Sequence, residues 1–104
     1  MVGDNMKEED TMLPLGSILR LKGAKQNVVV IGYAVIEEGD VKPWDYLGCP
    51  YPTGVIASDQ NLMFNKEDID RVIFLGYSAE EDKKYRDTLN QTLKRLKSNG
   101  KLPL

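Results

Sequence analysis

Residues 27–36 of this 104-residue chain, NVVVIGYAVI, form its longest run of apolar and β-branched side chains. Such residues favour extended backbone, and a run of this length bounded by turn residues indicates a buried strand. Gly32 interrupts the run, and a glycine inside a strand is typical of a bulge or sharp bend. The sequence therefore predicts a long central strand whose bend lets a small sheet curl.

Shorter strand patterns lie on both sides of this run. Residues 17–22 alternate, so that Leu19 and Leu21 would face the core. Arg20 and Lys22 would then face solvent. Further runs of strand-forming residues, separated by turn residues, lie at 44–49, 55–57, 62–64 and 71–77. Because successive strands are joined by short turns, we expect them to pair antiparallel.

Two helical segments are also predicted. Asn65 is a typical N-cap for one helical turn over residues 66–69. Ser78 and Glu81 have the capping-box spacing for a second helix, which Gly100 would end. The apolar stripe of this helix consists of Tyr85, Leu89, Leu93 and Leu96. We expect the stripe to dock on the sheet and the basic side chains to stay largely in water, namely Lys84, Arg86, Lys94, Arg95 and Lys97.

These elements predict the α+β class, with one domain over residues 12–104. Residues 1–11, which hold four acids and one lysine, are expected to be a disordered acidic leader. Strands would occupy about residues 17–77, and the C-terminal helix about residues 79–98. The sheet of five or six strands is expected to be either a small SH3-like β-barrel or an open, curled antiparallel meander.

The composition argues against several functional classes. The chain has 14 Lys plus Arg, 16 Asp plus Glu, one Cys and no His. It therefore lacks the commonest general base and metal ligand, and its single cysteine cannot form an internal disulfide. Cys49 is expected to be a buried structural residue. The acids of residues 37–40 and 67–70 lack EF-hand spacing and are expected to be solvated turn residues. We expect no enzymatic activity, no metal and no cofactor.

Targeting signals are missing from the sequence. Residues 1–11 have neither the basic start nor the apolar run of a signal peptide. No stretch approaches the roughly 18 apolar residues of a membrane span. We expect a cytoplasmic protein that does not enter a membrane.

A segment rich in aromatic residues and proline is the best candidate for a binding surface. Five such residues lie within nine positions, namely Trp44, Tyr46, Pro50, Tyr51 and Pro52. Trp44 and Tyr46 share one strand face, opposite Asp45, and are expected chiefly in the core, where truncating Trp44 would cost roughly 3–5 kcal/mol. Tyr51 lies between two prolines in a loop, where exposure and burial are about equally expected. Rigid rings anchor protein interfaces, so Tyr51→Ala would weaken a complex by about 1–3 kcal/mol if Tyr51 is such an anchor. The candidate protein interface consists of Tyr51, Pro50, Pro52, Tyr33 and Trp44.

A nucleic-acid or small-ligand surface is the alternative binding role. It would use Tyr33, Trp44, Tyr51 and Arg20, because small barrels bind single strands through stacked rings in a basic groove. The net charge of -2 argues against such a groove.

Several motifs, in their order and spacing, resemble domain-of-unknown-function family 4176. They are MLPLGS at residues 12–17, VIG at 30–32, WDYLGCPYPTG at 44–54, FNKEDID at 64–70 and VIFLGY at 72–77. The resemblance implies a small protein of Gram-positive bacteria, encoded beside type VII secretion genes and toxins with an LXG domain. It further implies a toxin-associated accessory role, as a chaperone or export adaptor, or alternatively as an immunity protein. The implied partner is a secreted toxin or its small helical partners, and the family supplies no catalytic residue.

Overall fold

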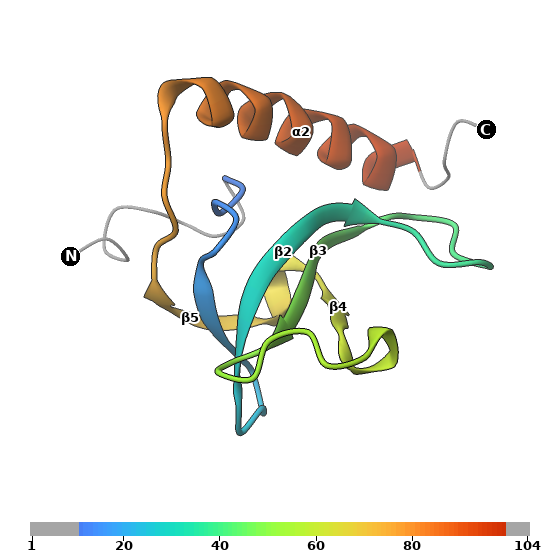
Figure 1. Ribbon diagram of the computed structural model, residues 1–104. Coiled ribbons are helices and arrows are strands. Elements are labelled where there is room, and N and C mark those ends of the chain that lie inside the picture. Colours follow the sequence, from blue (N-terminus) through green and yellow to red (C-terminus); the bar gives the residue numbers. More distant parts are fainter. Residues whose placement is uncertain (1–10, 100–104) are drawn as a thin grey trace.

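Strand β2 (Asn27–Val35) is the centre of the fold in this computed structural model, which describes residues 11–99. It lies in a five-stranded antiparallel sheet of order β4-β3-β2-β1-β5. The other strands are β1 (Ile18–Leu21), β3 (Trp44–Pro50), β4 (Leu62–Phe64) and β5 (Ile69–Phe74). Helix α2 (Glu80–Asn99) lies across one end of the curled sheet (Figure 1). The predicted α+β class is confirmed, with five strands and an open sheet.

The predicted bend in β2 is confirmed. The β2–β3 pairing shifts register between Val30 and Gly32, which is the signature of a bulge. Beyond the bulge, Ala34 adopts a φ of 54°, which adds to the departure from regular strand geometry. The first part of β2 pairs with β1, whereas its whole length runs beside β3. The sheet therefore curls around a single interior.

One cluster of buried side chains fills that interior. Its members come from every strand, from the segment before β1 and from α2: Met12, Leu13, Leu19, Val28, Val30, Tyr46, Phe64, Ile69 and Leu93. Tyr46 is completely buried, and its ring stacks on Phe64 with the centroids 5.3 Å apart. Cys49 is buried, as predicted.

The strand predicted at residues 55–57 is wrong. The Gly54 N–H donates to the Pro50 carbonyl at 2.8 Å, and Gly54 has a φ of 78°, so the chain turns away from β3. Val55 and Ile56 are then exposed in a loop, which continues through the 3-10 helix η2 (Ser58–Gln60). Pairing with β3 resumes only at β4.

The last strand also ends earlier than predicted, at Phe74 rather than at residue 77. Gly76 packs so closely on the segment before β1 that a Cβ there would lie 2.2 Å from the Leu15 carbonyl oxygen. The Gly76 N–H donates to Ser17 Oγ at 3.0 Å. The chain therefore leaves the sheet as a linker, and Tyr77 belongs to this linker.

The two predicted helix caps have different outcomes. Asn65 and Asp68 form the capping box of the 3-10 helix η3 (Lys66–Asp68), which confirms the predicted helical turn. At α2, the Ala79 N–H donates to Asp82 Oδ1, so the cap lies one residue later than the predicted Ser78 and Glu81. The predicted stop at Gly100 lies outside the described residues.

The docking of α2 is partly as predicted. Leu93 is buried, Leu89 and Leu96 are half-buried, and Lys84, Lys94 and Arg95 are exposed. Two expectations are wrong, however, because Tyr85 is 60% exposed and Arg86 is only 6% exposed. Lys97 is also half-buried rather than free in water. Arg86 donates to the Met12 carbonyl before β1, and Lys97 donates to Asp45 of β3 and to Asn65.

Candidate functional site

The residues of the interface predicted from the sequence do not form one surface. Tyr51, 43% exposed, follows β3 in a loop with the exposed Pro52, and Pro50 is the half-buried last residue of β3. Tyr33 and Trp44 lie at the opposite end of the β2–β3 ladder, where Val35 faces Trp44. Six residues of strand separate the two ends, a distance of about 20 Å. Tyr51 is therefore remote from both.

Trp44 is half-buried and lies outside the core cluster, which corrects the expectation of a core residue. Its indole N–H donates to Asp40 Oδ2 at 3.1 Å. The same carboxylate oxygen accepts from the Glu37 N–H at 2.9 Å. Trp44 thus closes the turn between β2 and β3, so we expect its truncation to cost less than that of a fully buried ring.

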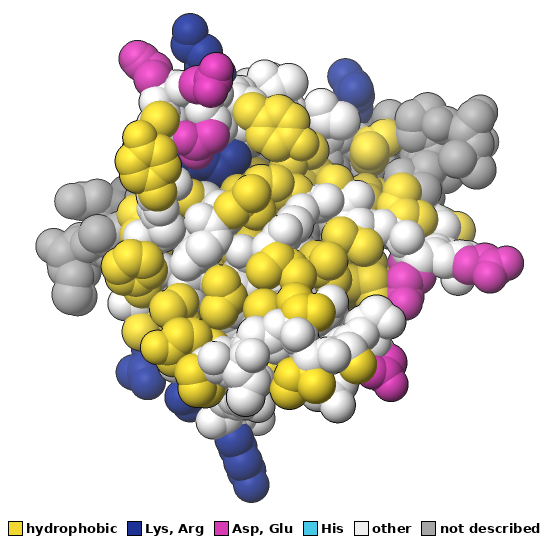
Figure 2. Space-filling view, in the orientation of Figure 1, with side chains coloured by type: hydrophobic (Ala, Val, Ile, Leu, Met, Phe, Trp, Pro, Cys, Tyr) yellow, Lys and Arg dark blue, Asp and Glu magenta, His cyan; other side chains and the backbone are white. Residues whose placement is uncertain are grey.

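An open groove of about 650 Å³ lies between β2 and the start of α2. Its lining is mainly apolar and aromatic, and comes from β2, the segment before β1, the linker and the first turns of α2: Leu15, Ile31, Gly32, Tyr33, Tyr77, Ala79, Glu81, Asp82, Tyr85 and Arg86. Figure 2 shows hydrophobic side chains gathered on this face. We call this feature the tyrosine groove.

Three of the five tyrosines of the chain line the groove. The Tyr33 hydroxyl donates to the Leu13 carbonyl at 2.6 Å, and its ring lies 6.0 Å from that of Tyr46 and 6.4 Å from that of Tyr85. Tyr33 therefore joins the groove to the core. Tyr77 and Tyr85 are 85% and 60% exposed, which gives the groove two large aromatic walls open to solvent.

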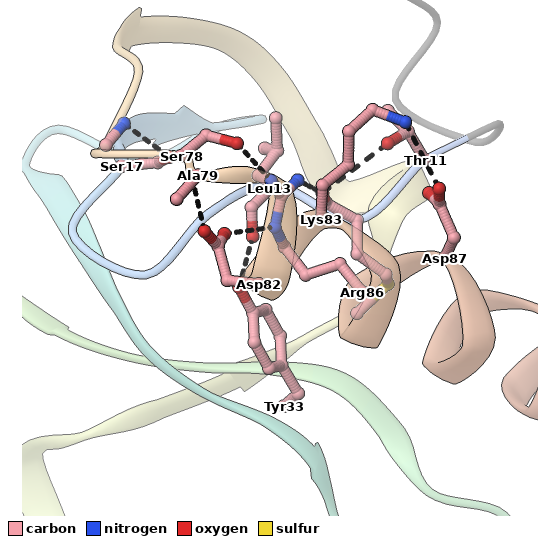
Figure 3. A network of polar contacts seen from close by, with 12 residues as sticks. Thr11, Leu13, Ser17, Tyr33, Ser78, Ala79, Asp82, Lys83, Arg86 and Asp87 are labelled. Carbon is pink, nitrogen blue, oxygen red and sulfur yellow. Dashed lines mark hydrogen bonds and ion pairs between the residues drawn. The ribbon is translucent and has the colours of Figure 1, made fainter.

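Arg86 holds the helical wall of the groove in place. Its guanidinium donates to the Met12 carbonyl at 2.8 Å, to Asp82 Oδ2 at 3.0 Å and to Ser78 Oγ. Figure 3 shows this guanidinium between Asp82 and the segment that contains Leu13. The pKa of Asp82 is lowered by the hydrogen bond from the Ala79 N–H and, further, by Arg86. This network fixes the first turns of α2 against the chain before β1.

A second polar cluster fastens the other half of α2. Asp45, 3% exposed, accepts from Lys97 Nζ at 2.6 Å and from the Lys66 N–H at 2.8 Å. Asn65 Oδ1 accepts from Lys97 Nζ and from the Asp45 N–H, both at 3.0 Å. Lys66 Nζ donates in turn to Asn90 Oδ1. We call this set the Asp45 cluster, and it explains why Lys97 is not solvated.

Comparison with protein families identifies the chain. The family model described as domain of unknown function (DUF4176) matches residues 12–85, most of the sequence. The chain belongs to the DUF4176 family. The match extends past the motifs noted in the sequence into the first turns of α2, so this DUF4176 domain includes every residue that lines the tyrosine groove except Arg86. No curated protein and no solved structure matches the chain.

The described part of the DUF4176 chain offers little for metal chemistry. Among residues 11–99, no three His, Cys, Asp or Glu side chains lie close enough together to hold a metal ion. Within the same residues, neither α2 nor any other helix has an apolar stretch long enough to cross a membrane. The groove presents rings, aliphatic side chains, the carboxylates of Glu81 and Asp82, and one buried guanidinium. Such a surface can bind an apolar segment of another molecule.

The sequence predicted only part of this groove. The sequence places Tyr33 among the candidate residues, but its patterns predict Tyr85 in the buried stripe and Tyr77 in the last strand. The signal that could have located the linker is Gly76, because a glycine between a strand and a predicted helix can mark a close backbone approach.

The buried phenols of this DUF4176 protein predict a loss of stability in alkali. Burial raises the pKa of Tyr33 from 10.0 to about 12, and burial likewise raises the pKa of Tyr46. Because both values are raised, the contribution of the neutral phenols is complete below pH 10 and is lost as the pH rises toward 12. Urea denaturation of wild type and Tyr33→Phe between pH 8 and 12 measures this. Tyr33→Phe should be less stable at pH 8, having lost the bond to Leu13, and should lose less stability above pH 10. If the free energy of unfolding fell equally steeply with pH in wild type and in Tyr33→Phe, the raised pKa of Tyr33 would be contradicted.

Proposed function

We propose that this chain is a non-enzymatic protein-binding accessory factor that binds its partner through the tyrosine groove. The observation that supports this is the exposure of large apolar side chains around one hollow. Leu15, Ile31, Tyr77 and Tyr85 all line the groove and are between 38% and 85% exposed. Contiguous apolar surface of this kind on a small domain usually marks an interface. Aromatic residues in particular anchor such interfaces, because they bury a large area at low entropic cost.

The family resemblance supplies the class of partner. Because the family resemblance implies a gene beside type VII secretion genes and LXG toxins, we propose a secreted LXG toxin as the partner and a chaperone or export adaptor as the role. Binding would take place in the cytoplasm before export. An exposed aromatic groove suits this role, since it can cover an apolar segment of the toxin until the segment is handed on.

Co-expression and pull-down of the full chain with an LXG toxin from a neighbouring gene tests the proposal, and groove variants locate the contact. Tyr77→Ala and Tyr85→Ala should each weaken the complex by about 1–3 kcal/mol, because each removes an aromatic anchor. Both side chains are largely exposed, so the free energy of unfolding should change by less than about 0.5 kcal/mol. Titration calorimetry and urea denaturation measure the two effects.

Val41→Ala is the matched control, because Val41 is a 65% exposed apolar residue in the turn between β2 and β3. It should leave the affinity unchanged. If Tyr51→Ala weakens the complex while the groove variants do not, the loop after β3 is the binding surface and the groove assignment is wrong. Failure of the wild-type chain to bind the toxin would contradict the proposed function. Binding confined to the C-terminal toxic domain, with loss of toxicity, would instead indicate an immunity protein.

A further inference from the structure

The apolar surface continues beyond the groove onto the outer face of the sheet. Cross-strand partners in an antiparallel sheet share a face. Phe74, Ile18 and Val29 form one such row across β5, β1 and β2. Phe74 is 58% exposed, and Ile31, two residues along β2 from Val29, is 38% exposed and lines the groove. The row and the groove together form what we call the outer strip.

Charges of opposite sign lie at the two ends of the outer strip. The next row of the sheet places Arg71 of β5 directly opposite Arg20 of β1. At the other end, Glu81 lines the groove and Glu80 precedes it in the first turn of α2, both exposed. Figure 2 shows Lys and Arg side chains at the lower edge of this face, near the β1–β2 turn, and both acidic and basic side chains at its upper edge.

The arginine pair is an unfavourable arrangement within the isolated chain. Like charges directly opposite each other on neighbouring strands destabilise a sheet. Arg20 Nε donates to Asn27 Oδ1 at 2.7 Å, but that amide carries no charge. Within residues 11–99, no ion pair involves Arg20 or Arg71. An acidic group from another molecule would relieve this repulsion.

The main chain of β1, which runs beneath the Phe74 row and the arginine pair, is already paired on both sides. Strand β1 lies between β2 and β5 and is hydrogen-bonded to both, so the free edges of the sheet are those of β4 and β5. An extended segment laid over β1 would find no backbone partners there and would leave its own N–H and C=O groups unpaired along that part of the strip. An α-helix satisfies its own backbone and can use side chains alone, which is the helix-in-groove mode of recognition.

We propose that the outer strip binds an amphipathic α-helix of the partner, with an acidic end over Arg20 and Arg71 and an apolar stripe that runs into the tyrosine groove. This rests on the proposed function, because the partner is the secreted toxin. From Asn27 beside the arginines to Tyr33 in the groove is about 20 Å along β2. At 1.5 Å per residue, a helix of about 13 residues, or roughly four turns, spans this distance.

Charge reversal at Arg71 tests the acidic end of the helix. Arg71→Glu places a glutamate opposite Arg20, so the variant should be at least as stable as wild type in urea denaturation. Its affinity for the full LXG toxin should nevertheless fall at least tenfold. Arg95→Glu, the same change on the exposed side of α2, should leave the affinity unchanged. Replacing the contacting acid of the toxin by lysine should restore binding to Arg71→Glu.

Photo-crosslinking tests the helical form of the bound segment. Benzoylphenylalanine is placed at Lys22, beside the arginines, and in a second variant at Tyr77, in the groove. If the bound segment is a helix, the two crosslinked residues of the toxin should lie about 13 or more positions apart in its sequence. If the segment is extended, they should lie only about six positions apart.

The outcomes separate this inference from the proposed function. If wild type binds the toxin but Arg71→Glu binds equally well, or the crosslinks lie about six residues apart, the helix-docking proposal is overturned while the proposed function stands. If wild type does not bind the toxin, both are overturned.

Discussion

Replacing Tyr46 with alanine should lower the free energy of unfolding by about 3–5 kcal/mol, the usual cost of removing a fully buried aromatic ring. Tyr46 has no exposed surface, and its ring packs between Phe64 and Tyr33. Its hydroxyl also accepts a hydrogen bond from the Leu13 N–H at 2.9 Å. The substitution therefore leaves a cavity and an unpaired buried donor at once. Urea denaturation followed by circular dichroism measures the loss.

Tyr46→Phe separates the two contributions, because it keeps the ring and removes the hydroxyl. The Leu13 N–H then loses its acceptor, so we expect a loss of about 1–3 kcal/mol. If Tyr46→Ala proved no more destabilising than Tyr46→Phe, the ring would not be the central element of the core.

The second large effect is expected at the Asp45 cluster. Asp45→Ala should destabilise the fold by roughly 3 kcal/mol, because it leaves the Lys97 ammonium and the buried Lys66 N–H without the carboxylate that binds both. Since these bonds join β3, η3 and the second half of α2, that half of the helix should also exchange its amide hydrogens faster. Chemical denaturation and hydrogen–deuterium exchange measure the two effects.

Asp87→Ala is the matched control for this prediction. Asp87 also pairs with a lysine of α2, Lys83, at 3.1 Å, but both side chains are more than half exposed. Exposed pairs contribute little, so the loss should stay below about 1 kcal/mol. Similar losses for Asp45→Ala and Asp87→Ala would show that burial of the Asp45 cluster contributes nothing.

The candidate functional surface was only partly predictable, and α2 shows why. The stripe of Tyr85, Leu89, Leu93 and Leu96 correctly indicates which side of the helix docks near its middle. At the first turns, however, Arg86 is buried and Tyr85 is exposed. Helical periodicity gives the spacing of the docking residues, but here the neighbouring chain decides which of them are buried. The Met12 carbonyl binds the Arg86 guanidinium, and Tyr85 is thereby left at the rim of the groove.

Strand β3 shows the same limit in the sheet. Alternation placed Trp44 and Tyr46 in the core and Asp45 on the opposite face, yet Asp45 is buried and Trp44 only half-buried. Alternation indicates burial only where one face of a strand meets solvent. Here the η3 turn and α2 bring Lys66 and Lys97 to the second face, and these contacts come from residues 21 and 52 positions away in the sequence.

The sequence by itself determined the features that depend on neighbouring residues: the bulge at Gly32, the N-cap at Asn65, the antiparallel pairing of strands joined by short turns and the existence of the last helix. Each follows from backbone freedom, side-chain shape or a hydrogen bond spanning a few positions. Only the tertiary structure decided the tyrosine groove and the arginine pair. The groove forms because β2 bends, Gly76 packs on Leu15 and Arg86 fixes α2. These three features bring together Leu15, Tyr33, Tyr77 and Tyr85. Likewise, Arg20 and Arg71 are 51 positions apart and become neighbours only through the pairing of β1 with β5. Such long-range contacts depend on the packing of the whole chain, which no local pattern encodes.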